Sequence, residues 1–218
     1  MILINAERKG FTLAEVLSTL AVVGVLAGIS IGIILPKIQD AQHRTAFKTE
    51  YSVLAQVTTR IAGDNGGSLK GVFTDNNTMK NKYKEYLNTI KSCDEDQTLG
   101  NCWHNNDGST KTLNGTPFTG WNNTTGLILN NGVLLRLGIN SPSCTALSGT
   151  VLFCGGIYVD VNGFKGPNTV GKDIYFIYIQ ENGINPRGTK DDGGYINTCT
   201  TSNTGWGCAA KVLMGQDY

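Results

Sequence analysis

Several kinds of residue are scarce in this chain of 218 residues. Charged residues make up only 16%, and the formal net charge of +1 provides no excess of positive charge with which to hold nucleic acid. The only two histidines are His43 and His104, which leaves few candidates for general-base catalysis. No cysteine precedes Cys93, and no charge occurs from Leu20 to Leu35. We therefore predict that the chain is not an enzyme and does not bind nucleic acid.

The uncharged stretch is part of a longer apolar run that starts at Phe11. As a helix, its roughly 25 residues would extend about 37 Å, enough to cross a hydrocarbon core of about 30 Å. Arg8 and Lys9 precede it and favour a cytoplasmic N-terminus, although Lys37 beyond it weakens that bias. An ordinary secretory signal peptide is a poor alternative, because no small-x-small cleavage site precedes Pro36. A simple membrane anchor remains the stronger alternative.

One carboxylate, that of Glu15, lies in the predicted membrane segment. An unpaired charge there costs at least about 2.5 kcal/mol. Glu15 either reaches the lipid headgroups from near the end of the span or has a partner of opposite charge.

The residues around Glu15 favour the second explanation. The sequence Gly10-Phe11-Thr12-Leu13-Ala14-Glu15-Val16-Leu17, behind a short basic leader, closely resembles the processing signature of the type IV pilin family, which includes the type II secretion pseudopilins. The resemblance implies that a prepilin peptidase/methyltransferase cuts after Gly10 and that Phe11 becomes the N-methylated N-terminus. It also implies that Glu15 pairs with the terminal amine of a neighbouring subunit, so that two groups costly to bury alone become tolerable together.

The same resemblance implies a location and a set of partners. The chain would cross the bacterial inner membrane once, with its N-terminus cytoplasmic and its head periplasmic or extracellular, and would later enter a filament. Its partners would be other pilin or pseudopilin subunits, the peptidase and an inner-membrane assembly platform. No cofactor is expected, apart from the calcium considered below.

Three glycines recur at every fourth position of the apolar run: Gly24, Gly28 and Gly32. On a helix they form one strip, and strips of small residues let helices approach closely in lipid. Glycine is also common in membrane helices for other reasons. We favour helix packing during filament assembly, which a solitary anchor would not need.

The chain divides into four predicted segments. Residues 1–10 are the leader peptide, 11–35 the transmembrane half of a long helix, 36–63 its amphipathic half, and 64–218 a globular head. Apolar residues of the amphipathic half recur at spacings of three and four, which indicates a helix with one face packed on the head; they are Phe47, Tyr51, Leu54, Val57 and Ile61.

The predicted fold class is α+β, with the long helix packed under an antiparallel sheet as in pilins. Asn77 is expected to cap a second helix whose apolar face contains Met79, Tyr83, Tyr86, Leu87 and Ile90. Asn130-Asn131-Gly132 predicts a hairpin turn, and we expect a sheet of about four or five strands. The expected strands include 127–129, 133–137, 151–153, 157–161 and 174–179, with a short additional strand at 208–213.

All six cysteines follow the predicted membrane segment, which indicates disulfides in an oxidising compartment. Sequence alone cannot select a connectivity. They do form three local pairs, and we propose Cys93–Cys102, Cys144–Cys154 and Cys199–Cys208. The last pair resembles the pilin family, whose members often close a C-terminal loop with a disulfide. A zinc site built from Cys93, Cys102 and His104 is rejected, because the spacing fits no zinc finger.

Calcium is the one metal that the sequence suggests. Asp160, Asn162 and, further along, Asp173 offer oxygen ligands of the kind calcium prefers. Some pseudopilins hold calcium in the C-terminal part of the sheet, which supports the idea by resemblance. The competing interpretation is a turn in which Asp160 and Asn162 bind backbone N–H groups.

Together these features predict a structural subunit, a minor pilin or pseudopilin of a type IV pilus or type II secretion pseudopilus. The alternative is a membrane-tethered extracellular binding protein or adhesin that does not polymerise.

Overall fold

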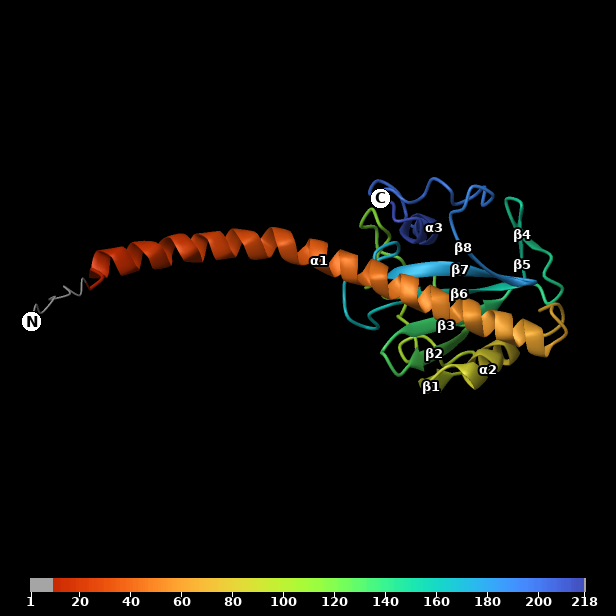
Figure 1. Ribbon diagram of the computed structural model, residues 1–218. Helices are drawn as coiled ribbons and strands as arrows, with labels where there is room; N and C mark the ends of the chain where they lie inside the picture. The colour runs from red at the N-terminus through yellow and green to blue at the C-terminus, as the bar shows by residue number, and fades with distance from the viewer. Residues whose placement is uncertain (1–9, 218) are drawn as a thin grey trace, which may run out of the picture. The chain divides into compact units, whose positions relative to one another are not determined.

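The computed structural model describes residues 10–217, apart from the side chains of residues 30, 31 and 33. Most of the predicted leader therefore lies outside the described residues. The chain divides into two units, Met1–Ala41 and Gln42–Tyr218, which we describe separately. The boundary falls within one long helix, α1, which spans Leu13–Asp64 (Figure 1).

In the first unit, the described side chains of α1 are exposed on every side from its start at Leu13 as far as Ile29. Pro36 lies inside the helix. Proline removes one backbone hydrogen bond, and here the helix continues through it. The single long N-terminal helix predicted from the sequence is thus confirmed.

The second unit is built on a six-stranded antiparallel sheet in the order β1-β2-β3-β6-β7-β8 (Figure 1). The strands are β1 Thr89–Cys93, β2 Thr125–Leu129, β3 Leu134–Ile139, β6 Gly155–Asp160, β7 Ile174–Gln180 and β8 Gly183–Pro186. A separate pair, β4 Ala146–Ser148 and β5 Val151–Phe153, forms a small ribbon. The α+β class is confirmed, and the sheet has one strand more than the upper end of the predicted range.

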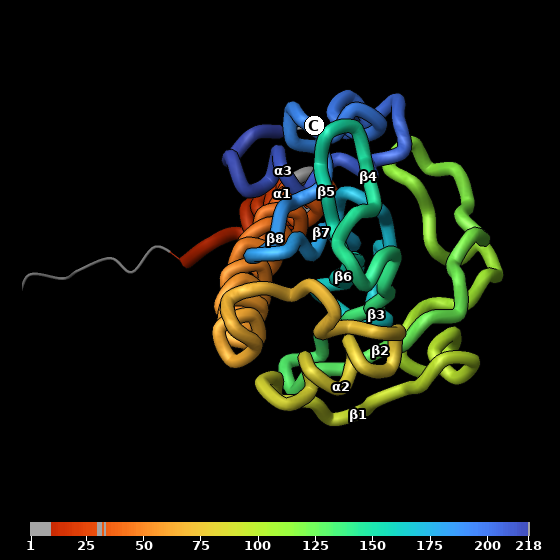
Figure 2. The backbone as a smooth tube through the Cα atoms, turned by 90° about the vertical axis from the view of Figure 1, so that its right-hand side faces the viewer, coloured from red at the N-terminus to blue at the C-terminus, as the bar shows by residue number. Residues whose placement is uncertain are grey.

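The part of α1 within the second unit covers one face of this sheet and lies beside β8 (Figure 2). Phe47, Leu54 and Ile61 are fully buried against strand residues such as Leu135 and Ile177. Phe47 also stacks on Tyr175 of β7, with ring centroids 4.1 Å apart. The apolar stripe predicted from spacing is therefore the face that forms the hydrophobic core.

The second helix, α2 (Asn76–Tyr86), begins and ends differently from the prediction. Its N-cap is Asp75, not Asn77, and the Asp75 carboxylate accepts a hydrogen bond from the Thr78 N–H at 2.7 Å. The backbone is extended from Leu87 onward, so Ile90 lies in β1 and is 69% exposed. Met79 and Tyr83 are buried, as predicted.

The prediction of a strand at residues 208–213 is wrong, because Cys208–Leu213 forms the short helix α3. Alanine and leucine favour a helix, and Ala209 and Ala210 are small enough to let it lie close to the core.

Both edges of the main sheet are irregular. On β1 the pairing register shifts between Thr89 and Lys91. At the other edge, β8 begins at Gly183 and ends at Pro186, and the Tyr51 hydroxyl donates a hydrogen bond to the Ile184 carbonyl. Short strands, bulges, proline and exposed lysine are features that stop a sheet edge from pairing with another chain.

Candidate processing and assembly segment

The start of α1 is closed by a reciprocal set of hydrogen bonds between Thr12 and Glu15. The Glu15 carboxylate (Oε2) accepts from the Thr12 backbone N–H at 2.8 Å and from the Thr12 hydroxyl at 2.9 Å. The Thr12 hydroxyl oxygen in turn accepts from the Glu15 N–H at 3.2 Å. This is a capping box, which satisfies N–H groups that a helix start otherwise leaves unpaired.

The capping box gives Glu15 a local role that the sequence analysis missed. Its signal, a threonine followed three positions later by glutamate, is present at Thr12-Leu13-Ala14-Glu15. The other carboxylate oxygen, Oε1, makes no hydrogen bond with any described residue. One oxygen thus orders the helix start, and the other is free to meet a second group.

The remaining predicted assembly residues lie on an open surface. Phe11 is 89% exposed and directly precedes the capping box. A Cβ atom built on Gly24, Gly28 or Gly32 would meet no atom within 4 Å. Nothing within the described chain therefore occupies the glycine strip, and it can accept a close neighbour.

By length and composition, α1 is the single helix among the described residues that could cross a membrane. Its most apolar stretch has a mean hydropathy of 2.3, and none of that stretch is buried within the protein. These properties fit membrane anchoring of this segment.

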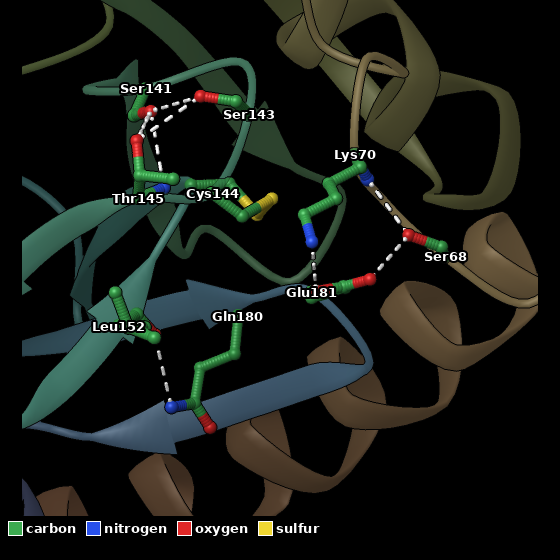
Figure 3. The surroundings of a disulfide bond; sticks show 10 residues. Ser68, Lys70, Ser141, Ser143, Cys144, Thr145, Leu152, Gln180 and Glu181 are labelled. Carbon is green, nitrogen blue, oxygen red and sulfur yellow. Dashed lines mark hydrogen bonds and ion pairs between the residues drawn. A yellow bond between two sulfur atoms is a disulfide. The ribbon is translucent and has the colours of Figure 1, made fainter.

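The cysteines form three disulfides, which are the three local pairs proposed from the sequence: Cys93–Cys102, Cys144–Cys154 and Cys199–Cys208. Because Cys93 and Cys102 bond to each other, neither supplies a thiolate, and His104 contacts Asp160 instead. Figure 3 shows the surroundings of Cys144, where the hydroxyl groups of Ser141, Ser143 and Thr145 bond to one another. Cys93 lies in β1 and Cys208 starts α3, whereas Cys154 lies between β5 and β6, so each disulfide joins an irregular loop to a regular element or to a residue beside one.

The predicted calcium ligands lie around the end of β6 and the start of β7, and each already has protein partners. Asp160 is fully buried, 2.7 Å from the His104 ring nitrogen Nε2, and it accepts a hydrogen bond from the Asn162 N–H. Asp173 accepts from the N–H groups of Asn168 and Thr169. Burial raises the pKa of Asp160 to about 7, and it also raises the pKa of Asp173.

The turn interpretation holds for Asp160, whose carboxylate accepts a backbone N–H, but not for Asn162, whose side-chain amide instead donates to the Gly166 carbonyl at 2.9 Å. Between residues 10 and 217, no group of three or more His, Cys, Asp or Glu side chains is arranged to hold a metal ion. The Asn162 side-chain oxygen is buried and has no partner. Calcium binding stays a prediction.

Residues 5–31 match the family described as "Prokaryotic N-terminal methylation motif". The chain carries a prepilin-type methylation motif. A search of curated proteins and a search of solved structures each found no match. The match covers residues 5–10 of the predicted leader, the capping box and most of the exposed apolar helix, which are the parts on which the predicted resemblance rested.

The methylation motif supports a type IV pilin-like protein, and it suggests a structural subunit more than an enzyme. It implies interaction with other pilins and with a prepilin peptidase in general. The long apolar helix, the antiparallel sheet and the three disulfides have the layout expected of such a protein.

Proposed function

We propose that the protein is a minor pilin or pseudopilin, a structural subunit of a type IV pilus or a type II secretion pseudopilus. The observation that carries this proposal is the exposed apolar helix, which starts at a capping box directly after Gly10-Phe11, within the methylation motif. In this proposal residues 1–10 are removed, Phe11 is N-methylated, and the N-terminus starts on the cytoplasmic side of the inner membrane.

The proposed function follows from what can cover the first half of α1. This half exposes more contiguous apolar surface than a monomeric soluble protein usually does, so another apolar surface must cover it. Lipid covers it before assembly, and the helices of neighbouring copies cover it in the filament. The strip of Gly24, Gly28 and Gly32 allows those helices to approach closely.

Glu15 would select the register of assembly. Thr12 holds one carboxylate oxygen of Glu15 near the helix start. The other oxygen would accept a hydrogen bond from the terminal ammonium of a neighbouring Phe11, which exists only after cleavage. In a low-dielectric surrounding each of these charges is costly alone, so pairing makes assembly depend on processing.

Processing is tested with Gly10→Val in the native host. We expect the variant to accumulate as a full-length precursor, because a side chain at Gly10 blocks close approach of the peptidase. Intact-mass spectrometry distinguishes it from a mature chain starting at Phe11. A mature chain from the variant would contradict the proposed cleavage.

Assembly is tested with Glu15→Ala, using sheared extracellular or periplasmic filaments as the readout. The variant should be cleaved normally but be absent from filaments, whereas Thr12→Ala should be cleaved and still assemble in part. If the wild-type chain stays wholly in membranes and never enters filaments, the alternative function, a tethered binding protein or adhesin, is correct instead.

A further inference from the structure

The sheet face opposite α1 carries a row of arginine and aromatic side chains. Arg136 of β3 lies opposite Tyr158 of β6, and Tyr158 lies opposite Phe176 of β7. Arg187 directly follows β8 and continues the row, because its backbone N–H donates to the Phe176 backbone carbonyl. Two guanidinium groups therefore flank two rings on one face of the sheet.

Beside this row the sheet has a gap in its side chains, because Gly138 and Gly156 are paired on β3 and β6. The Phe176 ring lies over Gly156, where an added Cβ would be 2.1 Å from the ring. Over Gly138 there is room, since an added Cβ would meet its nearest neighbour, Thr124, at 3.4 Å. The result is a cavity of about 200 Å³ lined by the row and the glycines.

Arg136 brings a positive charge to this cavity without a negative partner. It is only 7% exposed, and it forms no ion pair with any described residue. Its Nε and Nη2 atoms both donate to the Asn122 carbonyl, whereas Nη1 has no acceptor in the described chain. Burying a guanidinium without a counter-ion is costly, and burial lowers the pKa of Arg136 accordingly.

Arg187 brings a second charge to the same cavity. Its guanidinium carbon lies 3.8 Å from the centre of the Phe176 ring, and its Nε donates to the Tyr178 hydroxyl. The acid nearest along this network is Asp192, which Tyr178 contacts at 3.3 Å and which forms no direct ion pair with Arg187 in the described structure.

Two neutral polar groups complete the lining. The Thr124 hydroxyl is buried and has no hydrogen-bond partner, although a hydroxyl group usually finds one when it is buried. The exposed Asn140 side chain lines the same cavity. The cavity thus presents hydrogen-bond donors, and no carboxylate lines it.

We propose that this cavity binds a small ligand through an oxyanion, a carboxylate or phosphate group, held by Arg136 and Arg187 with help from Thr124 and Asn140. A planar guanidinium presents parallel N–H donors that match the oxygens of these groups. The ligand would supply the negative charge that Arg136 lacks and a partner for the Thr124 hydroxyl. This site does not depend on the proposed assembly function, since it lies on the sheet face opposite α1.

The test is a titration of the full chain in detergent micelles, followed by tryptophan fluorescence. Trp121 is a suitable reporter because the Arg136 guanidinium lies 5.6 Å from its ring centre. The probes are inorganic phosphate, acetate, glucuronate and glucose 6-phosphate, with sodium chloride at matched ionic strength to remove general screening effects. We expect a saturable change with at least one oxyanion and none with chloride. If glucuronate and glucose 6-phosphate bind more tightly than acetate and phosphate, the natural ligand carries its oxyanion on a larger molecule. If acetate or phosphate binds more tightly, the natural ligand is a free ion.

Asn140→Asp is the most informative variant, because it places a carboxylate at the cavity while keeping nearly the same shape at an exposed position. It should raise the dissociation constant at least about tenfold, since like charges repel at short range. Arg187→Gln should do the same, and Asn101→Asp, an exposed asparagine outside the cavity, should leave binding unchanged. Arg136→Gln is less suitable because its burial makes misfolding a risk. Absence of saturable binding by every probe, or unchanged binding by Asn140→Asp, would overturn the proposal.

Discussion

The two halves of α1 have the same backbone and opposite surroundings. Leu26 in the first half is 59% exposed, whereas Leu54 in the second half is fully buried. The first half is apolar on all sides, and the second has an apolar stripe with polar residues beside it. A helix between a protein core and solvent has an apolar stripe, whereas a helix surrounded by apolar material on all sides is apolar all round. The sequences of the two halves therefore indicate their different surroundings.

The largest effect should come from Leu54→Ala, which removes a core side chain of the second half. We expect it to lower the free energy of unfolding by about 2–5 kcal/mol, through lost burial and the cavity left behind. Denaturant unfolding of the full chain in detergent, followed by near-ultraviolet circular dichroism, measures this.

Val53→Ala is the matched control, because Val53 is the next residue and is 37% exposed. It should change stability by less than about 0.5 kcal/mol, as should Leu26→Ala in the first half. A loss at Leu26 as large as that at Leu54 would remove the distinction between the halves.

Removing one disulfide should have the next largest effect. The double variant Cys199→Ser/Cys208→Ser should lose about 2–3 kcal/mol in the chain-entropy account, a little less than a longer loop would lose. The pair Cys93–Cys102 closes a loop of the same sequence separation, 9, and serves as the comparison. In this variant and in the matching Cys93→Ser/Cys102→Ser variant, the helicity of the first half of α1 should stay the same. A loss of that helicity would show that the two halves are not independent.

The predicted calcium site near Asp160 lies in the second unit, so calcium should stabilise that unit and leave the first half of α1 unchanged. A site held at tenfold its dissociation constant contributes about 1.4 kcal/mol to stability. A calcium chelator should therefore lower the melting temperature of the full chain, and added magnesium should not restore it. Asp173→Asn should show a smaller chelator effect, whereas an unchanged melting temperature of the wild type would rule out the site.

Several features could be predicted from the sequence, because they are determined by residues that are close together in the chain. The stripe from Phe47 to Ile61 and the hairpin at Asn130-Asn131-Gly132 follow from spacing and turn chemistry. The methylation motif could also be predicted, because its signature consists of consecutive residues around Gly10 and Glu15.

Other features depend on contacts that sequence does not display. Ile90 continues the helical spacing of α2, but pairing of β1 with β2 takes it into the sheet. Residues 208–213 form a helix because of the packing of two small alanines. The cavity beside Arg136 could not be predicted, because it depends on the pairing of Gly138 with Gly156 across strands.

A smaller effect is expected from Thr12→Ala at the start of the first half. Loss of the capping hydroxyl should cost about 1 kcal/mol of local helix stability. Hydrogen exchange in micelles should become faster at the amides of residues 12–16, and global unfolding of the second unit should not change. Thr19→Ala is the control, since the Thr19 hydroxyl only bonds to the carbonyl of Val16 within the helix.

The smallest effect should be a pH dependence from Glu50, a buried carboxyl on the second half of α1. Burial raises its pKa above the usual 4.5, and the hydrogen bond from Asn131 offsets part of that rise. The folded state then holds the proton more tightly than the unfolded state does. Stability present below about pH 4.5 is therefore lost as the pH rises through the folded-state pKa.

Glu50→Gln should flatten this part of the pH profile and keep the contact with Asn131. The measurement is the free energy of unfolding at several pH values from 4 to 8, with Gln56→Glu as a control for an exposed carboxylate. A Glu50→Gln profile identical to that of the wild type would show that Glu50 does not titrate differently on folding.

The irregular edges of the main sheet have a consequence for crowding. Copies of a chain held at high local concentration can exchange strands and form amyloid-like aggregates when a flat, regular strand is left open. The register shift in β1 and the proline that ends β8 remove both such templates. In the proposed filament, heads brought together by their helices would therefore remain separate folded bodies.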